Sequence, residues 1–149
     1  MSTPLYAADV ADRSLFDHTA KPWDVRDLDT LLQRSIPPVK GVTCATLFVG
    51  MWRTAFAWHT EDYDLSALNF HHHGAPKYWY GVPASSKQRF MAMCTQLFPG
   101  QQDQCQAFLR HKHNVVAPSV AKDYGIPIFR CVQGPGEFVE KSAYHIFFP

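Results

Sequence analysis

Short segments typical of β-strands, separated by turn-forming residues, run through most of this 149-residue sequence, which contains 11 prolines and 8 glycines. Runs of four to eight residues rich in β-branched and aromatic side chains, bounded by Gly or Pro, are typical of strands. We expect strands at 43–49, 53–61, 66–71, 78–82, 114–117, 128–133 and 137–139. We expect helices at 23–34, 85–98 and 103–111, where apolar residues recur at helical spacing. The predicted fold class is therefore mainly β with a helical insert, as in a β-sandwich or jelly roll.

The composition excludes several classes of protein. With 46% hydrophobic residues the chain is globular, and its net charge of +1 gives no electrostatic case for nucleic acid as the main partner. No apolar run approaches the roughly 20 residues of a membrane span, and the N-terminus lacks a signal-peptide pattern. We therefore expect a cytosolic or nuclear protein whose four cysteines are reduced thiols.

A His-x-Glu pair, His59 and Glu61, is the first candidate site. Side chains two apart on a strand point to the same face, so both can reach one metal ion. A second histidine would complete the facial triad that binds Fe(II), and His145 is the candidate. The alternatives are a half-buried strand with an acidic end and, for His145, a core residue. The run 71–73 is three histidines, but only alternate members of a strand share a face.

Other polar residues each allow two interpretations. Lys77, at the start of an aromatic strand, either pairs with the carboxylate of a small acid or extends to water from an edge strand. Asn69 and Tyr6 either hydrogen-bond a ligand carboxylate or are satisfied core residues. Cys105 and His111 are either zinc ligands or a helix-face thiol and a solvent-exposed histidine.

Together these segments resemble the Jumonji-C (JmjC) histone lysine demethylases, in particular the trimethyl-lysine subfamily. The run 50–62, which includes the His-x-Glu pair, is nearly identical to the iron-binding strand of that family. The segment 105–112 is similar to the zinc segment of the subfamily. Further similar segments, in family order, are 6–10, 69–80, 117–120, 124–127 and 136–138.

The resemblance implies a cupin-like double-stranded β-helix, or jelly roll. Residues 1–40 would be a lead-in segment of the catalytic core, and residues 41–149 a partial JmjC domain. The chain would lack the JmjN region and the C-terminal end of the JmjC domain, so the jelly roll would be incomplete. The segment 139–143 is about two residues shorter than its family counterpart, and a one-residue slip there would turn His145 to the other face.

The resemblance also implies roles for individual residues. The iron ligands would be His59, Glu61 and His145. The 2-oxoglutarate pocket would comprise Tyr6, Asn69 and Lys77, with Phe56 and Trp79 as apolar walls. Cys105 and His111 would be two of four zinc ligands, while Gly41 and Phe48 would line the methyl-lysine pocket, Phe48 replacing an expected tyrosine.

The function implied is Fe(II)- and 2-oxoglutarate-dependent oxidative demethylation of tri- or dimethyl-lysine on the histone H3 tail, in the nucleus. In that reaction an N-methyl group is hydroxylated and leaves as formaldehyde. The expected cofactors are Fe(II) and 2-oxoglutarate, with Zn(II) as a further candidate, and the expected partner is the H3 tail, without a membrane or a specific DNA sequence. One alternative is a non-catalytic truncated chain that acts as a chromatin interaction module. A second is a JmjC hydroxylase of unmethylated side chains, against which the segment 105–112 argues.

Overall fold

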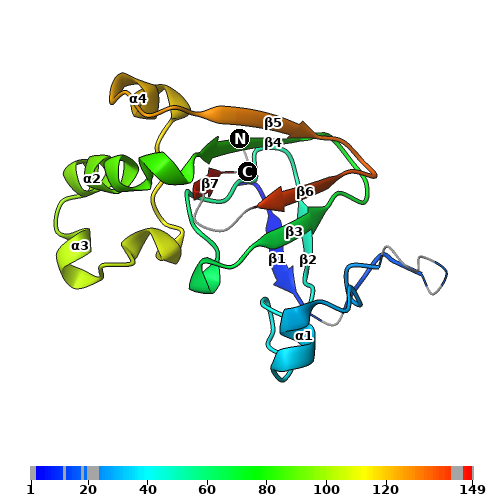
Figure 1. The fold of residues 1–149 in the computed structure, drawn as a ribbon. Helices are drawn as coiled ribbons and strands as arrows, with labels where there is room; N and C mark the ends of the chain where they lie inside the picture. Colours follow the sequence, from blue (N-terminus) through cyan, green and yellow to red (C-terminus); the bar gives the residue numbers. More distant parts are fainter. Residues whose placement is uncertain (1–2, 12, 18, 20–23, 142–145, 149) are drawn as a thin grey trace. The chain divides into compact units, whose positions relative to one another are not determined.

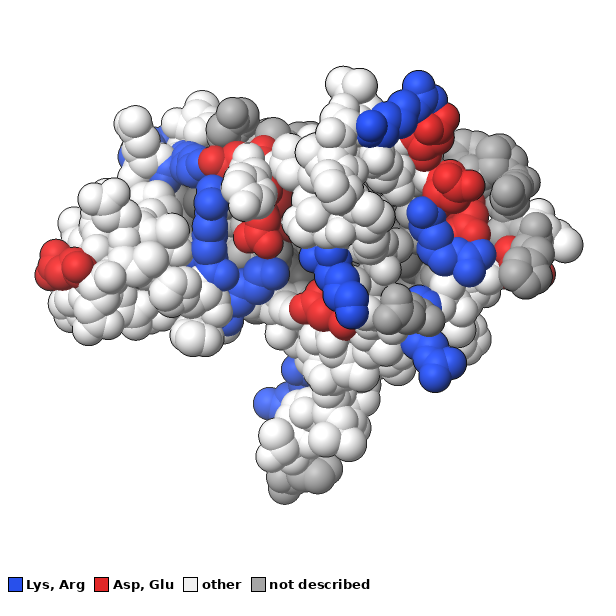
Figure 2. Space-filling view, turned by 90° about the horizontal axis from the view of Figure 1, so that it is seen from below, with Lys and Arg blue, Asp and Glu red and all other residues white. Residues whose placement is uncertain are grey.

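The computed structural model describes residues 3–11, 13–17, 19, 24–141 and 146–148. The chain forms two compact units, Met1–Thr54 and Ala55–Pro149. This division falls after residue 54, whereas the sequence analysis placed the end of a lead-in segment at residue 40. The assignment of 1–40 and 41–149 as functional parts stays a prediction. On the face shown in Figure 2, basic and acidic side chains are interspersed.

The first unit contains a two-stranded antiparallel sheet. Strand β1 (Tyr6–Val10) pairs with β2 (Leu47–Gly50), with Tyr6 opposite Gly50 and an irregularity before Val10. Strand β2 confirms the end of the strand expected at 43–49, whereas β1 was not expected. The two strands are far apart in sequence but adjacent in space (Figure 1).

The helix expected at 23–34 is wrong over most of its length, because helix α1 covers only Leu31–Ser35. Two aspartates explain the late start. The side chain of Asp24 accepts the backbone N–H of Arg26 at 2.9 Å, a local bond that competes with helix formation, and Asp29 has a φ of 52°. The helix then begins directly after Thr30, its N-cap residue, whose side chain forms a capping box with Gln33.

The second unit contains two small antiparallel sheets (Figure 1). In one, β3 (Ala67–Phe70) pairs with β6 (Phe138–Lys141). In the other, β4 (Lys77–Val82) lies between β5 (Phe129–Gln133) and β7 (Ile146–Phe148). These elements confirm the strands expected at 66–71, 78–82, 128–133 and 137–139. The prediction of a mainly β chain with a helical insert is also confirmed.

Helices fill the interval between β4 and β5 (Figure 1). In chain order they are η2 (Ala84–Ser86), α2 (Lys87–Leu97), α3 (Gln101–Gln104), η3 (Phe108–His111) and α4 (Pro118–Asp123). Helix α2 confirms the helix expected at 85–98. The strand expected at 114–117 is wrong, and α4 follows it with Pro118 in its first turn, where proline needs no hydrogen-bonding partner. Within the described ranges, no helix is long and apolar enough to cross a membrane.

The segment 53–61 is not a continuous strand, contrary to the sequence analysis. Arg53 lies in a turn with a φ of 72°, and the short helix η1 (Asp62–Asp64) follows the segment. Trp58 is 1% exposed and packs on Phe90 of α2 with ring centroids 5.1 Å apart. Its indole N–H donates to the carbonyl of Val116 at 2.7 Å, so this segment is fixed to the helical insert by a buried hydrogen bond.

The core of the second unit lies where the helical insert packs against Trp58 and the end of β4. Its buried members are Trp58, Val82, Phe90, Met93, Cys94, Phe108, Leu109, Val116, Ala121 and Ile126. At Gly81 of β4, a Cβ atom would overlap the ring of Phe129, which is directly opposite on β5. Glycine is therefore required at this position by the close approach of the ring.

Candidate functional site

His59 directly follows Trp58, a residue of the core. Its side chain is 3% exposed, and its Nδ1 atom lies 2.8 Å from the carbonyl oxygen of Ala57. Because a carbonyl can only accept, Nδ1 of His59 carries a proton, and Nε2 is the nitrogen through which the ring could bind a metal. A metal-binding histidine is typically held in this way by a hydrogen bond from its other nitrogen.

Glu61 faces Nε2 of His59. Its Oε1 atom lies 3.6 Å from Nε2 of His59, and the same oxygen forms an ion pair with Nζ of Lys141. Burial raises the pKa of the Glu61 carboxyl, but the neighbouring His59 and Lys141 outweigh this effect and lower the pKa to about 2. Glu61 is therefore a carboxylate at neutral pH.

The pair has a geometry that suits one divalent ion. Two ligands at adjacent corners of an octahedron, each about 2.1 Å from the ion, lie roughly 3 Å apart. The 3.6 Å separation between Nε2 of His59 and Oε1 of Glu61 is slightly wider than this value. His145 lies outside the described residues. Among the residues that are described, no cluster of three or more His, Cys, Asp or Glu side chains could hold a metal.

Lys77 and Asn69 lie together in the second unit. Nζ of Lys77 donates to Oδ1 of Asn69 at 3.0 Å. Burial of Lys77, and next the positive charge of Lys141, lowers the pKa of the Lys77 ammonium. A half-buried ammonium with a neutral amide partner is suited to an anionic ligand, since the anion supplies the missing negative charge.

A buried hydrogen-bond network joins the two sheets beside Lys77. The indole N–H of Trp79 donates to Oε1 of Gln133 at 2.9 Å. The amide nitrogen of Gln133 donates to the carbonyl oxygens of Asn69 and Glu137, at 3.1 and 2.9 Å. Gln133 is 1% exposed, so these bonds are shielded from water and hold Trp79 and Asn69 in fixed positions.

Lys141 is a member of the site that the sequence analysis missed. It is directly opposite Ala67 in the β3–β6 sheet, two positions from the Val139–Asn69 pair, and therefore points to the same face as Asn69. Its Nζ atom lies 5.8 Å from the ring centroid of Trp79, and its side chain is 12% exposed. The sequence of β6, two apolar residues followed by two charged ones, shows no alternation, so no local signal indicated an inward Lys141.

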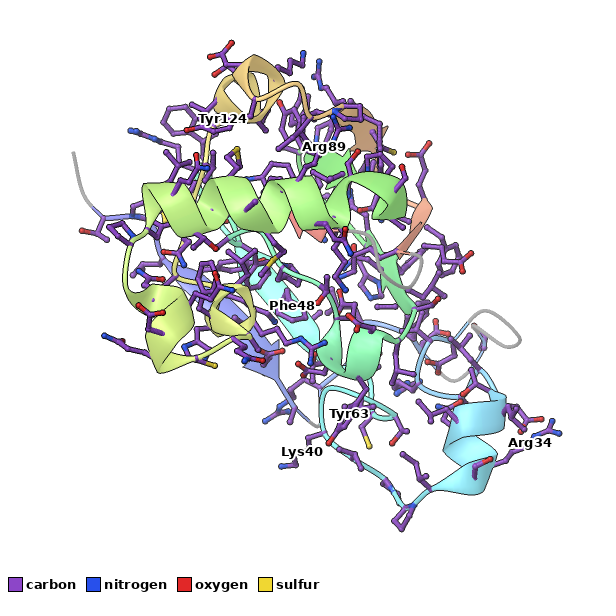
Figure 3. All side chains as sticks on the ribbon, turned by 60° about the vertical axis from the view of Figure 1, so that its left-hand side comes forward. Arg34, Lys40, Phe48, Tyr63, Arg89 and Tyr124 are labelled. Atoms are coloured by element: carbon purple, nitrogen blue, oxygen red, sulfur yellow. The ribbon has the colours of Figure 1, made fainter. Side chains whose placement is uncertain are left out.

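Three predicted site residues lie in the first unit. The ring centroids of Tyr6 on β1 and Phe48 on β2 are 6.3 Å apart, and Phe48 is labelled in Figure 3. Burial, and then the charge of Asp9, raises the pKa of Tyr6 to about 12. Gly41 is in an exposed turn with a φ of 74°, a conformation that glycine adopts without strain. The roles predicted for these residues stay predictions.

The predicted zinc ligands lie near each other in sequence, after helix α3. Cys105 is half-buried and ends that helix, while His111 is exposed in η3, with its ring 6.1 Å from that of His113. Of the histidine run, His71 is buried, and its two ring nitrogens lie within 3.3 Å of backbone carbonyls. The ring of His72 instead packs edge-on against Phe70. Neighbours in this run therefore make different contacts.

The arrangement defines a class of site: a His-x-Glu pair suited to a divalent ion, beside a half-buried lysine suited to an organic anion, on small antiparallel sheets. Residues 46–147 match the family model described as "JmjC domain, hydroxylase". The chain therefore belongs to the JmjC domain family, and its fold is the cupin-like jelly roll expected from the sequence. JmjC hydroxylases depend in general on Fe(II) and 2-oxoglutarate, which agrees with the donor set of this site.

The chain is also similar to curated proteins named as lysine-specific demethylases. The chain is 44% identical to lysine-specific demethylase 4D of Rattus norvegicus over 146 residues, and 43% identical to probable lysine-specific demethylase 4F of Homo sapiens over 145 residues. It is 41% identical to lysine-specific demethylase 4B of Mus musculus over 141 residues. These alignments cover 95%, 95% and 92% of this chain but only 28%, 23% and 13% of the relatives. The chain thus corresponds to a small part of each relative.

Proposed function

We propose that this chain carries the iron- and 2-oxoglutarate-binding part of a demethylase that acts on tri- or dimethyl-lysine in the histone H3 tail. The observation that carries the proposal is the 3.6 Å approach of His59 Nε2 and Glu61 Oε1, in the same unit as the Lys77–Asn69 pair. The JmjC match and the names of the demethylase relatives support the substrate class. The proposed location is the nucleus, where this substrate is found.

In this proposal His59 and Glu61 hold Fe(II), with His145 as the third protein ligand. The iron, with 2-oxoglutarate and O2, supplies the oxidation of an N-methyl carbon, which yields succinate, carbon dioxide and, after loss of formaldehyde, a less methylated lysine. The contribution of the chain is orientation. The bond between Nδ1 of His59 and Ala57 keeps Nε2 of the imidazole directed at Glu61.

Lys77 binds the far carboxylate of 2-oxoglutarate in this proposal. Its ammonium already points at Asn69, so both side chains present hydrogen-bonding groups to the same ligand. Trp79 supplies an apolar wall whose position is fixed through Gln133, and Phe56, whose ring lies 6.3 Å from that of His59, supplies a second wall. Exclusion of water by these rings strengthens the charge interaction at Lys77.

The remaining assignments belong to the same proposal. Tyr6 hydrogen-bonds the 2-oxoglutarate carboxylate, and Gly41 and Phe48 line the methyl-lysine pocket. Cys105 and His111 supply two ligands for a Zn(II) ion, because thiolate and imidazole are typical zinc donors. The proposed partner of the chain is the H3 tail.

An anaerobic titration with Fe(II) and 2-oxoglutarate tests the proposal. We expect a metal-to-ligand charge-transfer absorption band in the wild-type chain and no band in His59→Ala. In Lys77→Met the 2-oxoglutarate concentration needed for half of the band rises at least about tenfold, equal to about 1.4 kcal/mol. Lys122→Met, which removes a lysine of helix α4, should leave the titration unchanged. A folded wild-type chain without a band at millimolar Fe(II) would contradict the proposal.

Mass spectrometry of a trimethyl-lysine H3 peptide then identifies the reaction. Demethylation removes about 14 mass units for each methyl group lost, whereas hydroxylation of an unmethylated side chain adds about 16. The second outcome would support a JmjC hydroxylase in place of a demethylase.

A non-catalytic interaction module is the second candidate function. The observation in its favour is the ion pair of Lys141 with Glu61, because this pair occupies the carboxylate that the metal requires. If no peptide mass changes while the folded chain still binds an H3 peptide, measured by fluorescence anisotropy, the second candidate is the correct one.

A further inference from the structure

Lys141 brings a positive charge to the oxygen that would bind the metal. Its Nζ atom pairs with Oε1 of Glu61, and this is the same oxygen that lies 3.6 Å from Nε2 of His59. An ion held by both His59 and Glu61 would therefore have to share this oxygen with the ammonium. Two cations on one carboxylate oxygen repel each other strongly where water is largely excluded.

The register of the β3–β6 sheet determines which way the Lys141 side chain points. Lys141 is directly opposite Ala67, on the face of the β3–β6 sheet that also presents Asn69. Only 12% of its side chain is exposed. Reversing its direction would require a one-residue slip of β6, which would also turn Val139 outward.

The surroundings of the ammonium favour its presence at this place. On one side it has the Glu61 carboxylate, and on another it lies 5.8 Å from the ring centroid of Trp79, within the range of a cation–π interaction. The charge of Lys141 is also felt at Lys77, where it adds to the effect of burial. If a metal displaced the ammonium from Glu61, Lys141 would have to reach water from a nearly buried position.

We propose that the ammonium of Lys141 takes the place of a divalent cation at the His59–Glu61 pair, so that metal binding requires its displacement. This inference rests on the proposed function, in which that pair is the metal site. Lys141 is then a residue that weakens metal affinity, and the chain binds a divalent ion only at concentrations that overcome the competition.

The test measures metal binding directly. Mn(II) is titrated into the full chain without 2-oxoglutarate, and the free ion is followed by its electron paramagnetic resonance signal. We expect Lys141→Met to bind Mn(II) at least about tenfold more tightly than the wild type, equal to about 1.4 kcal/mol. Lys141→Arg, which keeps a cation at this position, should show no such gain.

The matched control is Lys87→Met. Nζ of Lys87 lies 3.4 Å from Oδ1 of Asp64, so this substitution also removes a lysine–carboxylate pair, but one that does not include the side chain of His59 or Glu61. We expect its Mn(II) affinity to equal that of the wild type. Lys141→Thr serves as a second variant if Lys141→Met does not fold, as checked by circular dichroism.

The outcomes separate the inference from the function on which it rests. If the wild type binds Mn(II) as tightly as folded Lys141→Met, the inference is wrong and the metal site stands. If neither binds Mn(II), the His59–Glu61 pair is not a metal site, and the proposed function fails with the inference. If the tighter binding of Lys141→Met is lost on adding His59→Ala, the gain is located at the proposed pair.

Discussion

Gln133 is the residue whose substitution tests the packing of the two sheets most sharply. It is 1% exposed and makes three hydrogen bonds, one from the indole of Trp79 and two to the carbonyls of Asn69 and Glu137. Methionine has a similar length and shape but can make none of these bonds. We therefore predict that Gln133→Met lowers the free energy of unfolding without changing the fold.

The loss of unfolding free energy in Gln133→Met can be calculated from the hydrogen-bonding groups that Gln133 leaves without a partner. The Trp79 N–H loses the acceptor seen in the structure, and an unsatisfied buried donor costs about 1–3 kcal/mol. The Asn69 carbonyl loses one donor but lies in the β3–β6 ladder opposite Val139, and the Glu137 carbonyl keeps the N–H of His71 at 3.1 Å, so each of these losses costs only about 0.5 kcal/mol. Burial of the less polar methionine returns about 1 kcal/mol. The net loss should be about 2 kcal/mol.

Urea unfolding followed by far-ultraviolet circular dichroism measures this loss. A double-mutant cycle with Trp79→Phe isolates the indole bond, and we expect a coupling of about 1–2 kcal/mol, because the unsatisfied N–H is then absent. Gln104→Met, at an exposed position of α3, should change stability by no more than about 0.5 kcal/mol. A loss below about 0.5 kcal/mol in Gln133→Met, or additive effects in the cycle, would refute the reasoning.

Three further predictions concern turns and caps. Burial raises the pKa of Asp64, but its two basic partners hold it below the usual 3.8, so its ionised form is favoured by folding. Asp64→Asn should therefore cost up to about 1 kcal/mol at pH 7, and the difference should vanish in urea titrations as pH falls below about 3.8. Tyr63 has a φ of 55° and is 82% exposed (Figure 3), so Tyr63→Gly should stabilise the chain by about 0.5–1 kcal/mol in the same assay. Thr30→Ala removes a capping box and should cost about 1 kcal/mol in thermal unfolding, whereas Thr30→Ser should not.

The strands of the second unit could be predicted because their local pattern and their environment agree. In β4, Tyr78 is exposed and Trp79 is buried, which is the alternation expected of a half-buried strand. The segment around His59 violates this pattern, since Ala57, Trp58 and His59 are all buried and no alternation marks them. The strand expected at 53–61 also does not begin at Arg53, because Arg53 lies in a turn with a positive φ. Turns of this kind are usually indicated by a glycine, and the residue at this position is an arginine.

The site could be predicted only in part. The spacing in the sequence predicted that the side chains of His59 and Glu61 point to the same face, and in the structure Nε2 of His59 lies 3.6 Å from Oε1 of Glu61. Their role as ligands stays a prediction, as do the roles of Tyr6 and Lys77. Lys141 could not be predicted as a member of the site, because its direction depends on the pairing of β6 with β3. The paired residues of these two strands are about 70 positions apart in the chain. Long-range register of this kind is not visible in local periodicity.

The contact between Gly81 and Phe129 has a consequence for how this strand pair can change over time. The ring of Phe129 covers the backbone at Gly81, so each position sets what the other can be. A larger residue at 81 would require a smaller one at 129, and loss of the ring would uncover the β4 backbone unless a side chain at 81 replaced it. We expect substitutions at these two positions to occur together among close relatives, so that the pair is inherited as one unit.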